Sequence, residues 1–172
     1  HIGCERHLFA SSITPDGYIT YVDTLIRGKI IYKILGALGT GKTTMLKKIG
    51  EEAKIRGLNV EYYHHPLDPE KIEHVILPDI NTALITTEEG AINNDCECRY
   101  FYNLNNYLKK RRRITEENKM NELLYEAIVN LQKAKKLHIE LENYYIPNMD
   151  FDSINICRED MLQKLKRLEV AT

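Results

Sequence analysis

The stretch ILGALGTGKTTMLKKIG, residues Ile34–Gly50, places three of the nine glycines of the chain within six residues. Its segment Gly36–Thr43 matches G-x-x-x-x-G-K-[ST], the Walker A pattern of phosphate-binding loops. Glycine lets the backbone take positive φ and leaves no Cβ in the way, so that successive N–H groups can surround a phosphate. The stretch therefore predicts a phosphate-binding loop.

The positions of this loop have expected roles. Lys42 is expected to reach the β- and γ-phosphates as a catalytic residue, and the Thr43 hydroxyl to bind Mg²⁺. The positive end of the following helix adds to the attraction for phosphate, and Thr44 is expected to donate near the α-phosphate. The predicted nucleotide-binding residues are Gly36, Ala37, Leu38, Gly39, Thr40, Gly41, Lys42, Thr43 and Thr44.

The residues on both sides of the loop fit a strand and a helix. Lys29–Leu35 is apolar and β-branched, as in a buried strand, and Thr43–Arg56 repeats apolar residues at helical spacing before Gly57. The plainer interpretation, a glycine-rich turn between strand and helix, leaves the Lys-Thr pair unexplained.

The next segments predict more strands. Asn59–His65, His74–Ile80 and Thr82–Thr87 are apolar runs, and Leu67–Glu73 suggests a short helix with Asp68 as its cap. Tyr18–Ile26 fits either a strand or a helix. The alternation predicts an α/β protein: a P-loop NTPase three-layer fold with a mostly parallel sheet.

The chain changes character near residue 100. Met120–Tyr145 and Glu159–Leu168 carry apolar residues at helical spacing, whereas Glu88–Asn106 has no regular pattern and is expected to be a loop or lid. We expect a nucleotide-binding core over residues 1–99 and a C-terminal helical part over residues 100–172 that packs on it, together forming one domain.

A carboxylate at a strand end is expected to assist Mg²⁺. Asp79 is the candidate, as a catalytic residue and a metal ligand, although it also fits a turn after Pro78. Glu88 is the alternative, as the residue that positions the attacking water.

Two other polar groups have open interpretations. His64, His65 and Asp68 fit either contacts to a second substrate or metal, or a polar strand end. The basic run Lys109–Arg113 fits a lid, a nucleic-acid contact or a solvated face.

Composition limits the partners. The chain has 172 residues, with 24 Lys plus Arg and 25 Asp plus Glu, which gives no electrostatic reason to expect nucleic acid or a membrane surface as a partner. No apolar run is long enough to cross a bilayer, and the four cysteines fit reduced thiols better than a zinc site. We expect a cytoplasmic protein.

Three stretches resemble a family of poorly characterised bacterial P-loop ATPases, labelled nucleotide-kinase-like. They are RHLFASSITPDG (Arg6–Gly17), ILGALGTGKTTMLKKI (Ile34–Ile49) and NVEYYHHPLDPEKIEHVILPDINTALI (Asn59–Ile85), with YYIPNMDF near the end more loosely similar. Members have two tandem P-loop halves, and this chain looks like the second. The resemblance implies ATP binding, and it implies a preceding homologous half or a homo-oligomer as partner. It implies no substrate.

The chain departs from the family at Thr86, where the fourth strand tends to end in an acid. The sequence thus predicts a Mg²⁺-dependent, ATP-binding P-loop NTPase that hydrolyses ATP or transfers its phosphoryl group. The alternatives are a small-molecule or nucleotide kinase, and a nucleotide-sensing module with little turnover.

Overall fold

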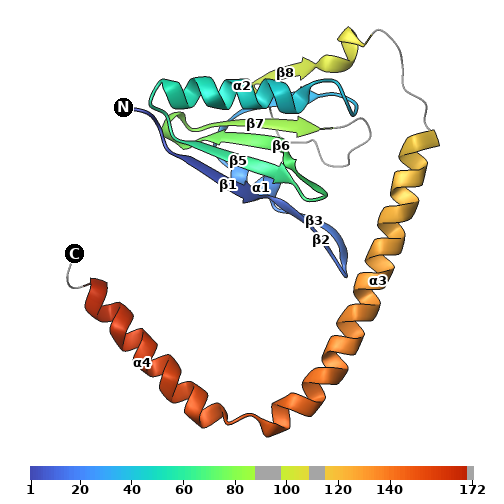
Figure 1. Cartoon of the computed structure of the whole chain (residues 1–172). Helices are drawn as coiled ribbons and strands as arrows, with labels where there is room; N and C mark the ends of the chain where they lie inside the picture. Colours follow the sequence, from blue (N-terminus) through green and yellow to red (C-terminus); the bar gives the residue numbers. More distant parts are fainter. Residues whose placement is uncertain (88–97, 109–114, 170–172) are drawn as a thin grey trace. The chain divides into compact units, whose positions relative to one another are not determined.

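The structure is a computed structural model of the chain that describes residues 1–87, 98–108 and 115–169 (Figure 1). The chain divides into two compact units, His1–Ile128 and Val129–Thr172. The first unit holds all the strands of the described part and the glycine-rich loop, so it carries the candidate site.

Over its described residues, the first unit contains strands, three helices and two 3₁₀ turns. Its strands are β1 (Glu5–Phe9), β2 (Ser11–Thr14), β3 (Gly17–Thr20), β4 (Ile30–Leu35), β5 (Val60–His65), β6 (Asp68–Leu77), β7 (Thr82–Thr87) and β8 (Tyr100–Asn103). The helices are α1 (Val22–Ile26), α2 (Lys42–Ile55) and the start of α3 (Thr115–Tyr145), and the 3₁₀ turns are η1 (Pro78–Ile80) and η2 (Leu104–Tyr107).

Six of these strands form one sheet in the order β1-β5-β6-β7-β4-β8, and β2 and β3 form a separate hairpin. The pairs β1–β5, β7–β4 and β4–β8 are parallel, whereas β6 is antiparallel to both β5 and β7. The sheet is therefore mixed. The predicted α/β class is correct. The predicted mostly parallel sheet of a P-loop NTPase three-layer fold is wrong, because β6 runs antiparallel to both of its neighbours.

The reversal of β6 follows from the short connections on its two sides. Only Pro66 and Leu67 separate β5 from β6, and a parallel pair needs a crossover of about a dozen residues or more. Leu67–Glu73, predicted as a short helix, lies mostly within β6 instead. Pairing with β5 fixes these residues as a strand, which outweighs the capping signal at Asp68.

Each face of the sheet has its own apolar core. Helix α2 lies along one face (Figure 1), where Leu46 and Ala53 pack with Ile34, Tyr62 and Val75. On the other face Ile26 of α1 joins a second cluster of buried residues, which are Ala10, Ile31, Tyr63, Ile76, Ala83 and Ile85. Helix α2 and strand β4 thus share one core.

Two segments that the sequence left open or irregular contain regular structure in their described residues. Tyr18–Ile26, predicted as either a strand or a helix, contains both, because β3 ends at Thr20 and α1 begins at Val22. Part of Glu88–Asn106 forms β8, which pairs with β4, so the sheet continues past residue 99.

The described residues of the second unit are mainly helical. Helix α3 ends at Tyr145, as its sequence pattern predicts before Pro147, and α4 (Phe151–Glu169) follows the 3₁₀ turn η3 (Ile146–Asn148). Helix α4 begins well before the predicted Glu159, because Asp150 caps it: Asp150 Oδ1 accepts from Ser153 N at 3.1 Å. None of the helices in the described ranges has an apolar stretch able to span a bilayer.

Candidate phosphate-binding loop

The glycine-rich segment connects β4 to α2. Strand β4 ends at Leu35 and α2 begins at Lys42, so Gly36–Gly41 is the loop between them. Because β4 lies between the parallel strands β7 and β8, the loop emerges at an edge where three strands end in the same direction. This is the strand–loop–helix context that the sequence pattern requires.

The three glycines have separate physical reasons. Gly39 and Gly41 have φ of 83° and 88°, in the left-handed region that side chains disfavour. A Cβ on Gly36 would lie 2.4 Å from Thr40 Oγ1, which is closer than real Cβ atoms approach a neighbour. Conformation requires two of the glycines and close approach requires the third.

The loop is curled and is anchored at both ends. Thr40 donates to Ala37 O twice, from its backbone N at 3.3 Å and from its Oγ1 at 2.8 Å. Gly36 N donates to Thr87 O of β7 at 3.2 Å, and Met45 N donates to Gly41 O at 3.0 Å as the helix begins. The first amides of α2 have no acceptor within the helix and are the donors that an anion could use.

The Lys42 side chain turns back onto the loop. Its Nζ donates to Gly36 O and also to Ala37 O, the latter at 3.4 Å. The structure therefore brings the ammonium group together with the loop backbone.

Thr43 and Thr44 lie in the first turn of α2. Thr43 Oγ1 donates to Ile72 O of β6 at 3.2 Å. A hydroxyl has one donor and two acceptor lone pairs, so this hydrogen bond leaves the oxygen able to bind a metal. Thr44 is exposed, as are Leu38 and Gly39 at the tip of the loop.

The structure places Asp79 far from this loop, which corrects its predicted catalytic and metal-binding roles. Because β6 is reversed, its carboxyl end lies beside the start of β4, where Ile30 N donates to Asn81 O at 2.9 Å. The six residues of β4 separate that edge from the loop by about 20 Å. The Asp79 carboxylate accepts from Asn59 N at 2.6 Å and from Asn59 Nδ2 at 3.2 Å. Asp79 therefore links the 3₁₀ turn η1 to the residue before β5.

The residues considered for a second substrate also lie away from the loop. His64 and His65 end β5, the third strand from β4, which puts them about 14 Å away at the usual strand spacing. His65 Nδ1 accepts from Leu67 N at 3.2 Å, and Asp68 forms an ion pair with Lys71 at 2.8 Å. These two side chains stabilise the β5–β6 turn. His64 Nε2 lies 2.8 Å from His7 Nδ1.

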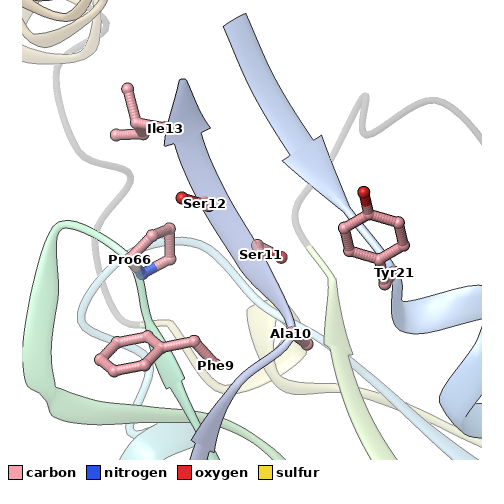
Figure 2. Close-up of a pocket in the computed structure, with 7 residues that line it drawn as sticks. All are labelled: Phe9, Ala10, Ser11, Ser12, Ile13, Tyr21 and Pro66. Atoms are coloured by element: carbon pink, nitrogen blue, oxygen red, sulfur yellow. The ribbon is translucent and has the colours of Figure 1, made fainter. Parts of the chain in front are cut away.

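A cavity of about 460 Å³ lies near the carboxyl ends of β1 and β5 (Figure 2). Ser11, Ser12 and Tyr21 offer hydroxyl groups there, and Phe9 and Pro66 add apolar surface. Phe9 ends β1 and Pro66 follows β5, so this cavity does not adjoin the loop. Phosphoryl transfer needs reacting atoms about 3–3.5 Å apart, so this geometry does not favour the kinase alternative.

A second cavity, of about 390 Å³, lies between α2 and the sheet. Its lining is mainly apolar and includes Ile34, Met45, Leu84 and Tyr102. This chemistry suits an apolar group and offers no cation for phosphate.

Sequence reasoning missed the residues of other elements that anchor the loop and the first turn of α2. Asn105 Oδ1 accepts from Ala37 N at 2.8 Å, and Thr87 and Ile72 accept through backbone carbonyls. Backbone acceptors leave no signal in sequence, because any residue supplies one. Asn105 had a weak signal, as an Asn in a polar NLNN stretch next to aromatic residues.

Several predicted features lie outside the described residues: Glu88, the basic run Lys109–Arg113 and Cys96. Within the described ranges, no group of three or more His, Cys, Asp or Glu is placed to hold a metal ion. No protein-family model, curated protein or solved structure matches the chain. The resemblance to two-half P-loop ATPases therefore stays a prediction.

A buried histidine lies beside the end of β7. His74 Nδ1 accepts from Thr86 N at 3.3 Å, and the residue is 4% exposed. Burial, with a smaller effect from the charge of nearby His65, lowers the pKa of His74 to about 4. Burial has a larger effect on this pKa than the Glu73 carboxylate, whose Oε2 lies 3.9 Å from His74 Nε2. The ring is neutral at pH 7.

We predict that this histidine makes the protein less stable in mild acid. The ordinary pKa of histidine is 6.5, and in the folded chain that of His74 is about 4. Between these two pH values the unfolded chain binds a proton that the folded chain does not, so the free energy of unfolding falls as pH falls. From pH 7 to pH 5 the expected loss is about 2 kcal/mol. Urea unfolding at both pH values measures it. His74→Leu should flatten the dependence, and His138→Leu, which removes an exposed histidine, is the control. An equal dependence in wild type and His74→Leu contradicts the assignment.

Proposed function

We propose that the chain is a Mg²⁺-dependent ATP-binding protein whose loop Gly36–Thr44 holds the triphosphate. The carrying observation is that the loop curls between a buried strand and α2 with Lys42 Nζ against its backbone. Backbone amides and one ammonium group on the same concave segment are what a phosphate chain needs. ATP is proposed over other triphosphates because of the family resemblance.

Binding requires Lys42 to exchange partners. Its ammonium donates to the carbonyls of Gly36 and Ala37, and phosphate oxygens are stronger acceptors because they are charged. The Thr43 hydroxyl can bind Mg²⁺ through its lone pairs while it donates to Ile72 O. Mg²⁺ keeps several waters and takes few protein ligands, so a single Thr hydroxyl plus phosphates fits its chemistry.

Calorimetric titration of the protein with ATP and with AMP, each with Mg²⁺, tests the proposal. ATP should bind at least about 100-fold more tightly than AMP, because the loop contacts the phosphates that AMP lacks. Equal affinity for the two nucleotides, or no binding of ATP, would overturn the assignment.

We predict that Thr43→Val removes the benefit of Mg²⁺. The wild-type affinity for ATP should fall about tenfold when EDTA replaces Mg²⁺, the worth of one interaction of about 1.4 kcal/mol. The variant should bind ATP with the same affinity in both conditions, and its affinity in EDTA should match that of wild type. A tenfold Mg²⁺ effect that persists in the variant assigns the metal to other ligands.

A nucleotide-sensing module with little turnover is the second candidate. It is favoured by the position of Asp79, which is about 20 Å from the loop, and by Thr86, whose hydroxyl donates to Glu73 O at 2.8 Å where the family tends to have an acid. Single-turnover measurement with γ-labelled ATP separates the two. A phosphate release rate at the uncatalysed background supports sensing, and a rate well above it supports hydrolysis.

A further inference from the structure

The segment that follows β8 is joined to the phosphate loop. Strand β8 pairs with β4 in parallel, with Asn103 opposite Leu35, and the 3₁₀ turn η2 begins at the next residue. The pairing of β4 with β8 therefore places η2 beside Gly36, the first residue of the loop.

The side chain of Asn105 makes the direct connection. Its Oδ1 accepts from Ala37 N at 2.8 Å. Ala37 N–H is a donor only, so the atom of Asn105 that faces it must be the oxygen. Asn105 itself is fixed, because its backbone N donates to Asn103 Oδ1 at 3.0 Å.

Packing supports the same connection. Leu104 Cβ lies 3.3 Å from the place where a Cβ on Gly36 would stand, and Leu104 also packs against the core beneath α2. The η2 turn thus touches the loop at two successive residues, through an apolar contact at Gly36 and a hydrogen bond at Ala37.

We propose that Asn105 is a positioning residue of the phosphate loop, a role that rests on the proposed function. By accepting from Ala37 N, its oxygen fixes the plane of the Gly36–Ala37 peptide and so the direction of the Gly36 carbonyl. That carbonyl accepts from Lys42 Nζ, and the Ala37 carbonyl of the next peptide accepts from both Thr40 donors. Asn105 thereby sets where the loop begins to curl and the place of its lysine. The Asn105 amide nitrogen, on the same carboxamide, adds neutral donor groups beside the loop, where a carboxylate would repel phosphate.

Three variants test this role: Asn105→Ala, Asn105→Asp and Asn106→Ala. Asn106 is the matched control, because it is the neighbouring residue of the same type and is exposed. The first readout needs no nucleotide. The ¹⁵N–¹H signal of Ala37 should lose its hydrogen-bonded shift and exchange faster with solvent in Asn105→Ala. It should stay hydrogen-bonded and slow to exchange in Asn105→Asp, whose carboxylate is a stronger acceptor, and should remain as in wild type in Asn106→Ala.

The second readout is the affinity for inorganic tripolyphosphate with Mg²⁺, which probes the loop without a base. We expect Asn105→Ala to weaken binding about tenfold, the size of one missing hydrogen bond. Asn105→Asp keeps the acceptor but adds negative charge, so it should weaken binding about thirtyfold, and high salt should recover part of that loss. Asn106→Ala should bind as wild type does.

The outcomes separate this inference from the proposed function. If wild type binds tripolyphosphate, Lys42→Ala does not, and both Asn105 variants bind as wild type does, Asn105 has no positioning role and the phosphate site stands. If wild type does not bind tripolyphosphate or ATP, the proposed function fails and the role falls with it, even where the Ala37 signal confirms the hydrogen bond.

Discussion

Replacing Lys42 with alanine should weaken ATP binding more than 100-fold while leaving the fold intact. The lysine is half-buried against the loop. Among the described residues, its ammonium is the positively charged group that donates hydrogen bonds to the loop backbone. Hydrogen bonds to charged groups are worth about 1.5–3 kcal/mol, and 1.4 kcal/mol corresponds to a tenfold change in affinity. Without the ammonium group, two such hydrogen bonds to phosphate oxygens cannot form, which weakens binding by more than about 100-fold.

Titration calorimetry with ATP and Mg²⁺ measures this loss. Lys47→Ala is the matched control, since Lys47 is an exposed lysine on the same helix, and its affinity should stay within about twofold of wild type. An equal and small loss for the two lysines would show that general positive charge, and not the loop, attracts the nucleotide. Raising the salt concentration gives a second distinction, because screening weakens exposed charges far more than a half-buried one.

Leu46→Ala should cost about 3 kcal/mol of folding stability. Leu46 is fully buried, at 0% exposure, where α2 packs against the sheet. Truncating such a side chain removes apolar burial and leaves a cavity, which together cost about 2–5 kcal/mol. The fully buried Ile34 and Val75 belong to the same core cluster as Leu46, so the core has little room to collapse into the gap.

Urea unfolding followed by tyrosine fluorescence measures this change, because the chain has eleven tyrosines and no tryptophan. Ile55→Ala is the control on the same helix: Ile55 is 68% exposed, and its truncation should change stability by less than about 0.5 kcal/mol. Below the unfolding transition Leu46→Ala should still bind ATP, since Leu46 lies in the core and other residues form the loop. A loss of ATP binding without a loss of stability would contradict both the core assignment and this separation of roles.

The loop and its two flanking elements could be predicted from sequence because their causes are local. Glycine spacing, an apolar strand and a helical repeat each occupy a few consecutive residues, and the structure gives strand β4 and helix α2 within about one residue of the predicted Lys29–Leu35 and Thr43–Arg56. The same holds for Thr82–Thr87, which forms β7 with the predicted bounds.

Strand direction could not be predicted from the apolar runs, because a buried strand has the same composition whichever way it points. The information was present in the two-residue connection Pro66–Leu67, but the sequence Asp68-Pro69 also fits the start of a helix. A parallel β6 would place Asp79 at the edge of the sheet where the loop lies. Because β6 is antiparallel, Asp79 lies at the opposite edge, beside the start of β4. One misjudged turn therefore accounts for the errors in both the sheet and the metal site.

The pairing of β4 also sets the order in which the loop acquires its shape. Strands β5, β6 and β7 follow one another directly and can pair as a meander, whereas β4 must enter between β7 and β8, with Ile30 opposite Thr82. Contacts between neighbours in sequence form with less loss of chain entropy than such distant ones. The hydrogen bond from Gly36 N to Thr87 O requires that β4 has paired with β7, so this anchor of the loop depends on the closed sheet. A ligand that binds the loop only in this native shape would therefore shift the folding equilibrium towards the native chain by mass action.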